Sequence, residues 1–430
     1  MSKSLVTNKS ITIAIVVASL GYCVDVFDIV LFSIFRVQSL TSMGLTPDQV
    51  LTSGVHILNM QLAGMLIGGF IWGVLGDKIG RIQVLFGSIL LYSFANIFNA
   101  YVHSVELYAL CRFIAGIGLA GEAGAAVTLV SELMSKSRRG IGTTIVAAAG
   151  TSGAIFASLA AEFLDWRSAF LLGGVMGLFL LVMRISVRES TMFDSIKNEK
   201  GVSRGNIFLL VSSWERFGRY LFTILAGIPL FFSYYTVVIY SPEVGRALGI
   251  EGVLSVARAT MVACITMTVG DLISGYMSQR FKNRKKVLFG FIAFASVATG
   301  ILLNLKGASA TMYYTVCGFV GFGMGYWAVF LTTGAEQFGT NIRATVASTV
   351  PNIVRAAPII MSTVVLYLKD SMGYIPSLQI VGALCFLISF FAIARMKETF
   401  GVDLNYVELN SGTKLLHTEE EDVKQAQGWR

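Results

Sequence analysis

Twelve apolar stretches dominate this sequence, and each is close to the length that an α-helix needs to cross a bilayer. About 20 consecutive apolar residues are enough for one crossing. The stretches cover approximately residues 11–36, 54–76, 83–102, 107–131, 141–164, 167–186, 216–240, 255–279, 287–305, 311–335, 343–368 and 374–396. Because isolated strands cannot satisfy their backbone groups in lipid, we expect every stretch to be a helix. The first is too long for the apolar region of a signal peptide, and no small-residue cleavage site follows it, so we expect it to remain as a membrane helix.

The scarcity of charge supports the same conclusion. Only 13% of the 430 residues are charged and 55% are hydrophobic, whereas about a quarter of a soluble globular chain is charged. This composition excludes a water-soluble enzyme, a disordered protein and a disulfide-rich secreted domain. The 44 glycines suit membrane helices, because small residues let such helices pack closely.

The net charge of +8 comes from loops on one side of the predicted membrane. When alternate loops are assigned to opposite sides, 25 of the 33 Lys and Arg residues fall on one side and six on the other, and Arg112 and Arg355 lie inside spans. Cytoplasmic loops carry the excess of Lys and Arg. We therefore expect an all-α chain of twelve spans in a bacterial inner membrane, with both termini in the cytoplasm and no binding of nucleic acid.

A weak internal repeat divides the chain. Glu132 precedes Arg139 by seven residues at the end of the fourth predicted span, and Glu336 precedes Arg343 by seven residues at the end of the tenth. Repeated halves of this kind are typical of secondary transporters. We predict an N-terminal six-helix bundle over 1–186, a cytoplasmic linker over 187–213, a C-terminal six-helix bundle over 214–396 and a solvated cytoplasmic tail over 397–430.

Acidic residues inside the spans are candidates for proton coupling, since a charge at the bilayer centre is costly unless it is paired or protonated. Asp25 and Asp28 share one face of the first span, and each disfavours ionisation of the other, as a proton carrier requires. Arg112 in the fourth span is their candidate counter-charge, and Glu122 on the same helix is a candidate second proton or substrate group. The alternatives are an aspartate that braces a neighbouring helix, a permanent ion pair and a hydrogen-bonded packing acid.

Arg355 lies in the middle of the eleventh span, which contains no acidic residue. A guanidinium keeps its proton, so it must face a cavity, a carboxylate or a substrate anion. We predict that Arg355, with Asn352 one turn earlier, binds an anionic group of a substrate. Asp271 in the eighth span is either the partner of Arg355 or the partner of a substrate ammonium. Four aromatic residues are expected to line the cavity, with core packing as the alternative for each: Tyr234, Tyr235, Tyr326 and Trp327.

Several motifs resemble those of known transporters. The stretch G-V-L-G-D-K-I-G-R at 73–81 resembles the loop signature of the major facilitator superfamily, and Arg112 with Gly116 and Gly118 resembles its fourth-helix motif. Three further stretches resemble the metabolite:proton symporter family: G-Y-C-V-D-V-F-D (21–28), A-G-E-A-G-A-A (120–126) followed by R-R-G (138–140), and R-E-S-T-M-F (188–193). The chain departs from these patterns at Ile82, Asp25 and Gln279, where a base, a Glu and an Asp are usual. Sugar-porter-like relatives share some of these features.

The resemblance implies a network of charges at the cytoplasmic helix ends that holds the two halves together in one state. Its members here are Asp77, Arg81, Glu132, Arg139, Glu336 and Arg343. Removing one of these charges should shift the balance between inward-facing and outward-facing states without changing the substrate pocket.

We predict a secondary active transporter that works by alternating access as a monomer in the lipid bilayer. It is expected to be a proton-coupled symporter that imports a small polar carboxylate-bearing metabolite, such as an organic acid, an amino acid or a zwitterionic osmolyte. The alternatives are a proton-coupled antiporter that exports small molecules and a non-transporting nutrient receptor on the same fold. The sequence contains no catalytic constellation, no C-x-x-C spacing and no phosphate-binding loop, so we expect no enzymatic activity, no metal and no cofactor.

Overall fold

A computed structural model describes residues 8–134, 139–184, 205–409 and 412–415. Its first group of helices consists of α1 (Asn8–Ser42), α2 (Pro47–Ile79), α3 (Arg81–Asn99), α4 (Val105–Leu119), α5 (Glu122–Leu133), α6 (Arg139–Phe163) and α7 (Trp166–Arg184). The second group consists of α9 (Phe208–Val211), α10 (Trp214–Ser233), the π-helix η1 (Tyr234–Ile239), α11 (Ser241–Leu248), α12 (Val256–Phe281), α13 (Arg284–Leu302), α14 (Ala310–Met324), α15 (Trp327–Glu336), α16 (Arg343–Met372) and α17 (Tyr374–Arg395). The two strands are β1 (Tyr406–Leu409) and β2 (Gly412–Leu415).

The prediction of an all-α chain with twelve spans is confirmed, because the described residues contain 12 helical segments long and apolar enough to cross a membrane. Most begin and end within a few residues of the predicted limits. The first is longer than predicted, since α1 continues past residue 36 to Ser42.

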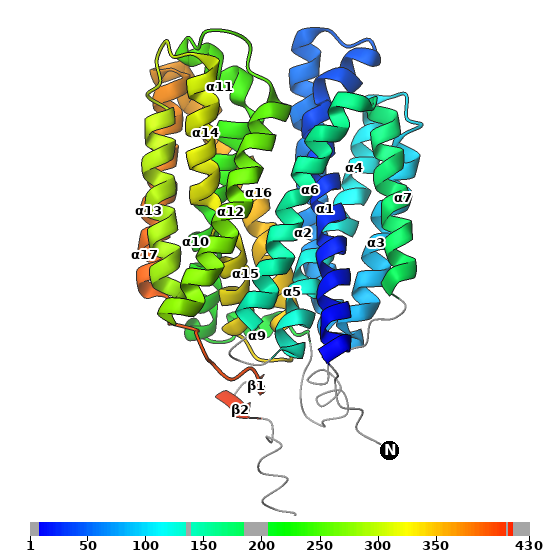
Figure 1. Cartoon of the computed structure of the whole chain (residues 1–430), viewed down its shortest axis with the longest axis vertical. Coiled ribbons are helices and arrows are strands. Elements are labelled where there is room, and N and C mark those ends of the chain that lie inside the picture. The colour runs from blue at the N-terminus through cyan, green and yellow to red at the C-terminus, as the bar shows by residue number, and fades with distance from the viewer. Residues whose placement is uncertain (1–7, 135–138, 185–204, 410–411, 416–430) are drawn as a thin grey trace, which may run out of the picture.

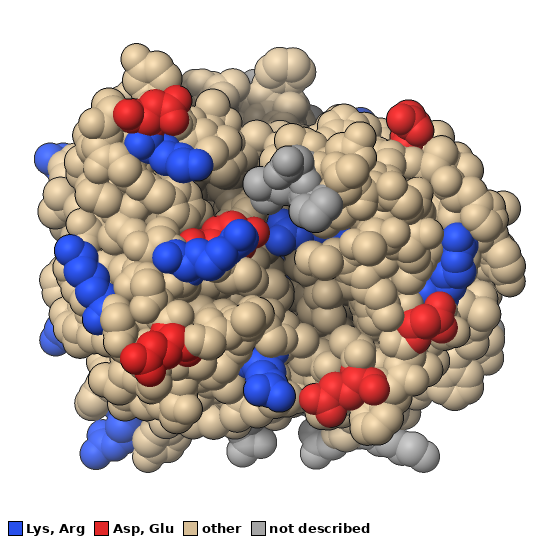
Figure 2. All heavy atoms as spheres, turned by 90° about the horizontal axis from the view of Figure 1, so that it is seen from above, with Lys and Arg blue, Asp and Glu red and all other residues tan. Residues whose placement is uncertain are grey.

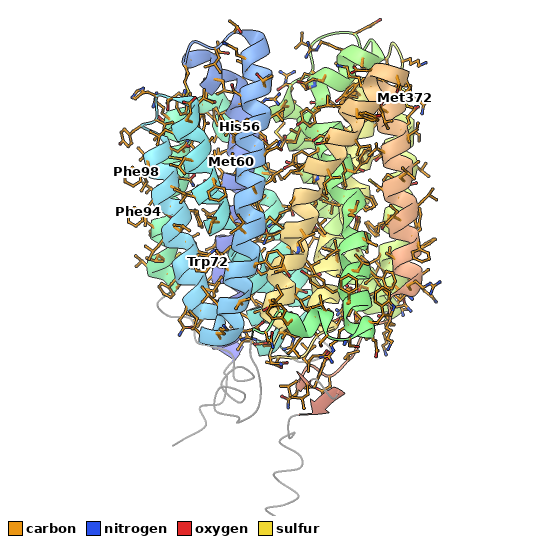
Figure 3. The ribbon with its side chains drawn as sticks, turned by 180° about the vertical axis from the view of Figure 1, so that it is seen from behind. His56, Met60, Trp72, Phe94, Phe98 and Met372 are labelled. Atoms are coloured by element: carbon orange, nitrogen blue, oxygen red, sulfur yellow. The ribbon has the colours of Figure 1, made fainter. Side chains whose placement is uncertain are left out.

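The helices form two groups that stand side by side, with α1–α7 on the right and α10–α17 on the left of Figure 1. Helix α1 begins at the same end of the bundle at which β1 and β2 lie, which we call the tail end; the opposite end is the far end. Phe94 and Phe98 are 50% and 66% exposed and point away from α3 (Figure 3). Large apolar side chains on the outer surface suit contact with lipid tails.

The fourth and tenth spans are each broken in the middle. Helix α4 ends at Leu119 and α5 begins at Glu122, while α14 ends at Met324 and α15 begins at Trp327. The carbonyl that the first break frees, that of Ala120, accepts hydrogen bonds from Ser348 and Asn352 of α16. Irregular backbone at membrane depth is tolerated where protein groups satisfy it, and here those groups belong to the other half.

The start of the C-terminal tail does not behave as the predicted solvated segment. Leu404 and Val407 are 1% and 0% exposed, and the tail bonds to the loop between α15 and α16. The N–H of Thr340 donates to the Tyr406 carbonyl (2.8 Å), and the Asn341 amide exchanges two hydrogen bonds with the Glu408 backbone (2.9 and 3.0 Å). The prediction was wrong here because the loop offers backbone partners that a count of polar residues does not reveal.

The predicted linker 187–213 lies outside the described residues up to 204. Its last part contains the short helix α9, in which Leu209 and Leu210 are buried.

Candidate functional site

Three side chains from both halves meet at the centre of the bundle. The Tyr22 hydroxyl on α1 accepts a hydrogen bond from the Trp327 indole N–H (2.7 Å) and another from Nη2 of Arg355 (3.2 Å). The Arg355 guanidinium also lies 5.5 Å from the centre of the Trp327 ring, within range of a cation–π interaction. All three are at most 4% exposed. We call Tyr22, Trp327 and Arg355 the central cluster.

The central cluster includes two residues that the sequence predicted and one that it missed. Pro351 and Pro358 flank Arg355 on α16, and each proline removes a backbone donor from the helix. Tyr22 was missed because an aromatic residue in an apolar helix carries no signal of its own. Its partners lie more than 300 residues away in the sequence.

Asn352 makes contacts on both sides of the boundary between the halves. Its side-chain amide donates to the Ala120 carbonyl of the first half (3.0 Å). Its oxygen accepts a long hydrogen bond from Arg355 (3.4 Å). The residue is therefore positioned to orient Arg355 while it joins α16 to the break in the fourth span.

Asp25 lies one helical turn after Tyr22 and is fully buried. Neither of its carboxylate oxygens has a hydrogen-bond partner among the described residues. The charges that act on it are those of Arg355, Glu122, Asp28 and Arg184. A buried carboxylate without hydrogen bonds is costly in its ionised form.

Asp28 faces a separate group of residues inside the first half. Arg112 donates a hydrogen bond to the Asn96 side-chain oxygen, and its guanidinium lies 4.5 Å from the centre of the Phe170 ring. Neither oxygen of Asp28 accepts a hydrogen bond of normal geometry from a described residue, although the Asn96 side chain lies near enough to act on it. Arg112 acts on Asp28 electrostatically, but the two do not form an ion pair in this state. Glycine at 173 leaves room for the Asp28 carboxylate against α7.

Glu122 forms a buried ion pair with Arg184 at the end of α7. A second contact of the pair, from Nη1 of Arg184 to Oε2 of Glu122, measures 2.9 Å. Arg184 was one of the 25 basic residues assigned to cytoplasmic loops, and that assignment was wrong, because its side chain is only 1% exposed and lies inside the bundle. Glycine at position 21 of α1 allows the pair to lie directly against that helix.

Asp271 does not contact Arg355. Its Oδ1 accepts the backbone N–H of Ala328 (3.0 Å), in the first turn of α15. A carboxylate at this position satisfies a free N–H group and interacts favourably with the helix dipole. Asp271 therefore acts as a cap for α15, which holds Trp327 in place.

The four predicted cavity aromatics have different surroundings. Trp327 packs against Phe330 (5.2 Å between ring centres) and Phe231 (5.5 Å) in addition to Arg355. Tyr326 is fully buried in the hydrophobic core of the second half. Tyr234 packs against Tyr235, and of these four only Tyr235 lines the large cavity described below.

Charged residues join the two halves at the tail end. Asp77 of α2 accepts hydrogen bonds from three groups at the start of α16: the N–H of Ala344 (3.0 Å), the N–H of Thr345 (2.8 Å) and the Thr345 hydroxyl (2.7 Å). Glu132 binds Arg81 of its own half (3.0 Å) and Arg343 of the other half (2.9 Å). We call Asp77, Arg81, Glu132 and Arg343 the tail-end network.

The remaining predicted members of this network lie elsewhere or outside the described side chains. Glu336 forms a bidentate pair with Arg284 (2.6 and 2.7 Å) within the second half, and it also accepts the Thr399 hydroxyl of the tail (2.8 Å). Arg139 is the first residue of α6, but its side chain lies outside the described part of the structure. Arg284 was missed because the repeat pattern pointed to Arg343.

A cavity of about 790 Å³ lies between the halves at the far end. Figure 2 looks onto this end and shows it hollowed between the two groups of helices. The lining includes Leu62 of α2, Tyr235 of η1 and Pro358 of α16. Arg36 of α1 and Glu243 of α11 form an ion pair across the boundary (3.5 Å). The tail end is thus tightly closed, whereas the far end retains a cavity whose lining includes Pro358, one turn after Arg355 on α16.

Comparisons with known proteins agree with this architecture. The sequence profile of the Major Facilitator Superfamily matches residues 18–362. The chain is 27% identical to the niacin transporter NiaP of Acinetobacter baylyi, over 80% of this chain and 85% of that protein. It is 25% identical to the cis,cis-muconate transport protein of the same species, over 92% and 97%. Its fold resembles that of a proton:xylose symporter bound to 6-bromo-6-deoxy-D-glucose, with a TM-score of 0.73 at 18% identity over 92% of this chain and 98% of that one. The chain belongs to the Major Facilitator Superfamily, and it is a multi-pass membrane transporter of small metabolites and not an enzyme.

Proposed function

We propose that this transporter is a proton-coupled symporter that imports a small polar metabolite bearing a carboxylate. The observation that carries the proposal is Arg355. It is a permanent cation at the centre of the bundle, and no carboxylate among the described residues lies within ion-pair distance of it. Buried charges are paired or bind a ligand, and a substrate carboxylate would supply the missing partner. Niacin and cis,cis-muconate, which name two relatives of the chain, are both carboxylic acids.

Asp25 and Asp28 are proposed to carry the protons. Both are fully buried, and their oxygens make no hydrogen bond with the described residues. The neutral carboxyl form is favoured in such surroundings, because an ionised group there costs several kcal/mol. Once ionised, Asp28 would pair with Arg112, whose Nε and Nη1 have no hydrogen-bond partner in the described structure.

Coupling follows from competition for Arg355. The ionised Asp25 carboxylate and a substrate carboxylate would both be attracted to the same guanidinium, which acts on Asp25 more strongly than any other charge does. A proton on Asp25 would therefore release Arg355 to bind the substrate, and loss of that proton would favour release of the substrate. This reciprocity is the thermodynamic requirement for coupled binding.

Alternating access would use the two ends of the bundle in turn. We assign the tail end to the cytoplasmic side of a bacterial inner membrane, because the excess of Lys and Arg falls on that side. The tail-end network would then close the cytoplasmic side in the present state. The far end, which the Arg36–Glu243 pair already bridges at one point, would close in another state. The central cluster and the tail-end network are each completed within a single chain, so a monomer suffices.

A second candidate is a proton-coupled exporter. It is favoured by the lining of the far-end cavity, which is largely apolar and aromatic and would also accept hydrophobic molecules. The two candidates differ in the direction in which a proton gradient drives the substrate.

The test uses the full chain in proteoliposomes with radiolabelled nicotinate and cis,cis-muconate. Wild-type protein should concentrate one of them when an inward proton gradient is imposed. Asp25→Asn, which removes the carboxylate that competes for Arg355, and Asp28→Asn should each abolish this accumulation and spare exchange of internal for external substrate, because exchange needs no net proton movement. Asp165→Asn is the matched control: Asp165 is exposed and bonds only within its own half. Normal accumulation by Asp25→Asn would rule out competition for Arg355, and normal accumulation by Asp28→Asn would rule out a proton-carrying role for Asp28.

A further inference from the structure

Tyr22 has a hydroxyl proton for which the described structure provides no acceptor. A phenol oxygen accepts up to two hydrogen bonds and donates one. Both acceptor positions of Tyr22 are occupied, by the Trp327 indole N–H at 2.7 Å and by Arg355 Nη2 at 3.2 Å. Neither group can accept a proton in return, since an indole N–H and a guanidinium are donors only. The Tyr22 O–H must therefore donate to a third group.

The obvious internal acceptor does not take this role. Asp25 is the acidic residue next along the same face of α1, and both of its oxygens lack a hydrogen bond to any described residue. The Asn352 side-chain oxygen accepts a hydrogen bond from Arg355 and none from Tyr22 in the described structure. Tyr22 as a residue is 2% exposed, so bulk water does not satisfy its hydroxyl either. A buried donor without an acceptor is costly, which indicates a position that a ligand fills.

We propose that Tyr22 is a specificity-determining residue whose O–H donates directly to the substrate carboxylate that Arg355 binds. The inference rests on the proposed function and deepens it, because it assigns the second donor of the carboxylate site. Trp327 contributes by fixing the direction of that donor: its N–H occupies one acceptor position of Tyr22, and Asp271 holds the start of the helix that carries Trp327.

The arrangement selects ligands by their hydrogen-bonding character. Tyr22 and Arg355 present donors only, so an ionised carboxylate, which only accepts, satisfies both. A carboxamide of the same shape presents one oxygen and an NH₂ group, and its NH₂ would face a donor. An ammonium group would meet donors and a cation. Tyr22 should therefore favour the acid over the corresponding amide.

Purified full-length protein in lipid nanodiscs tests this assignment with nicotinate and nicotinamide, which share one ring and differ in the group that would meet Tyr22. Binding is measured by titration calorimetry. Tyr22→Phe should weaken nicotinate binding by about tenfold to a hundredfold, the effect of one hydrogen bond to a charged group. Nicotinamide binding should change less than threefold. Tyr313→Phe is the matched control, since it also removes a buried phenol that makes one hydrogen bond, to the Val237 carbonyl.

A spectroscopic measurement separates direct donation from an effect through Arg355. The infrared band of nicotinate labelled with ¹³C in its carboxylate should shift on binding to wild-type protein, and part of that shift should be lost in Tyr22→Phe. An unchanged band in a variant that binds more weakly would overturn direct donation. If Tyr22→Phe weakened the binding of nicotinate and of nicotinamide equally, the proposed selectivity would be overturned. It would also be overturned if wild-type protein bound none of three carboxylates: nicotinate, benzoate and cis,cis-muconate. Wild-type protein that binds nicotinate with this selectivity but does not accumulate it would refute proton-coupled import and leave the assignment of Tyr22 in place.

Discussion

Asp77→Asn is expected to open the tail end of the bundle. Asp77 accepts three hydrogen bonds from the start of α16, at 3.0, 2.8 and 2.7 Å, and all three cross between the halves. Its contact with Arg81 at 3.5 Å stays within one half. That contact is therefore present in both the closed and the open state and contributes little to the difference between them. Asparagine keeps one acceptor oxygen, loses the charge, and turns an NH₂ group toward backbone donors. Hydrogen bonds to a charged group contribute about 1.5–3 kcal/mol each, so we expect a net loss of about 3 kcal/mol from the closed state. This corresponds to a shift of about 150-fold in the ratio of closed to open molecules.

Distances between spin labels measure this shift directly. Lys78 at the end of α2 and Lys282 at the end of α12 are exposed and belong to different halves, so both can be replaced by labelled cysteines. Cys23 is replaced by alanine, because it is only partly buried and could react with the label. The other four native cysteines are buried and are left in place. A longer-distance population should dominate in Asp77→Asn and stay minor in the Asp165→Asn control. A folded Asp77→Asn protein whose distances match those of wild type would refute the role of this contact in closing the tail end.

Two further results are expected. Asn341→Ala removes both side-chain hydrogen bonds to the Glu408 backbone and should free the start of the tail, since each bond contributes about 1 kcal/mol. Hydrogen exchange of the backbone amides at residues 404–409 should then rise several-fold. Unchanged exchange would contradict the docking of the tail. Glu122→Gln leaves Arg184 buried without its counter-charge and should lower the free energy of unfolding by about 3–5 kcal/mol. If the variant melted in detergent at the same temperature as wild-type protein, the pair would not be needed for stability.

Much of the fold could be predicted from the sequence because a bilayer imposes a length on every apolar helix. The twelve spans follow from this requirement alone. The breaks in the fourth and tenth spans could not be predicted from it, since α4 and α5, for example, together form one apolar stretch in the sequence. The break at Ala120 depends on side chains of α16 that bond its carbonyl, and hydropathy contains no information about that neighbour.

The site was predicted only where one residue is anomalous by itself. A charge inside an apolar span is such an anomaly, and Asp25, Asp28 and Arg355 were chosen as candidates in this way. Tyr22 and Arg184 are ordinary residues at their own positions, and their importance comes from partners on other helices. An arginine at the very end of a span could have been recognised as a possible partner of Glu122, but its rotation about the helix axis is set by packing.

Proton movement coupled to substrate uptake is the central claim, and the pH inside proteoliposomes tests it most directly. A pH-sensitive dye is enclosed in vesicles that contain the full chain, and the labelled carboxylate that wild-type protein accumulates is added outside under an imposed gradient. Signals from protein-free vesicles are subtracted, because weak acids cross bilayers unaided. The lumen should become more acidic in proportion to the substrate taken up, and Asp25→Asn and Asp28→Asn should each abolish the effect. Substrate uptake without acidification, or with a rise in lumenal pH, would contradict symport.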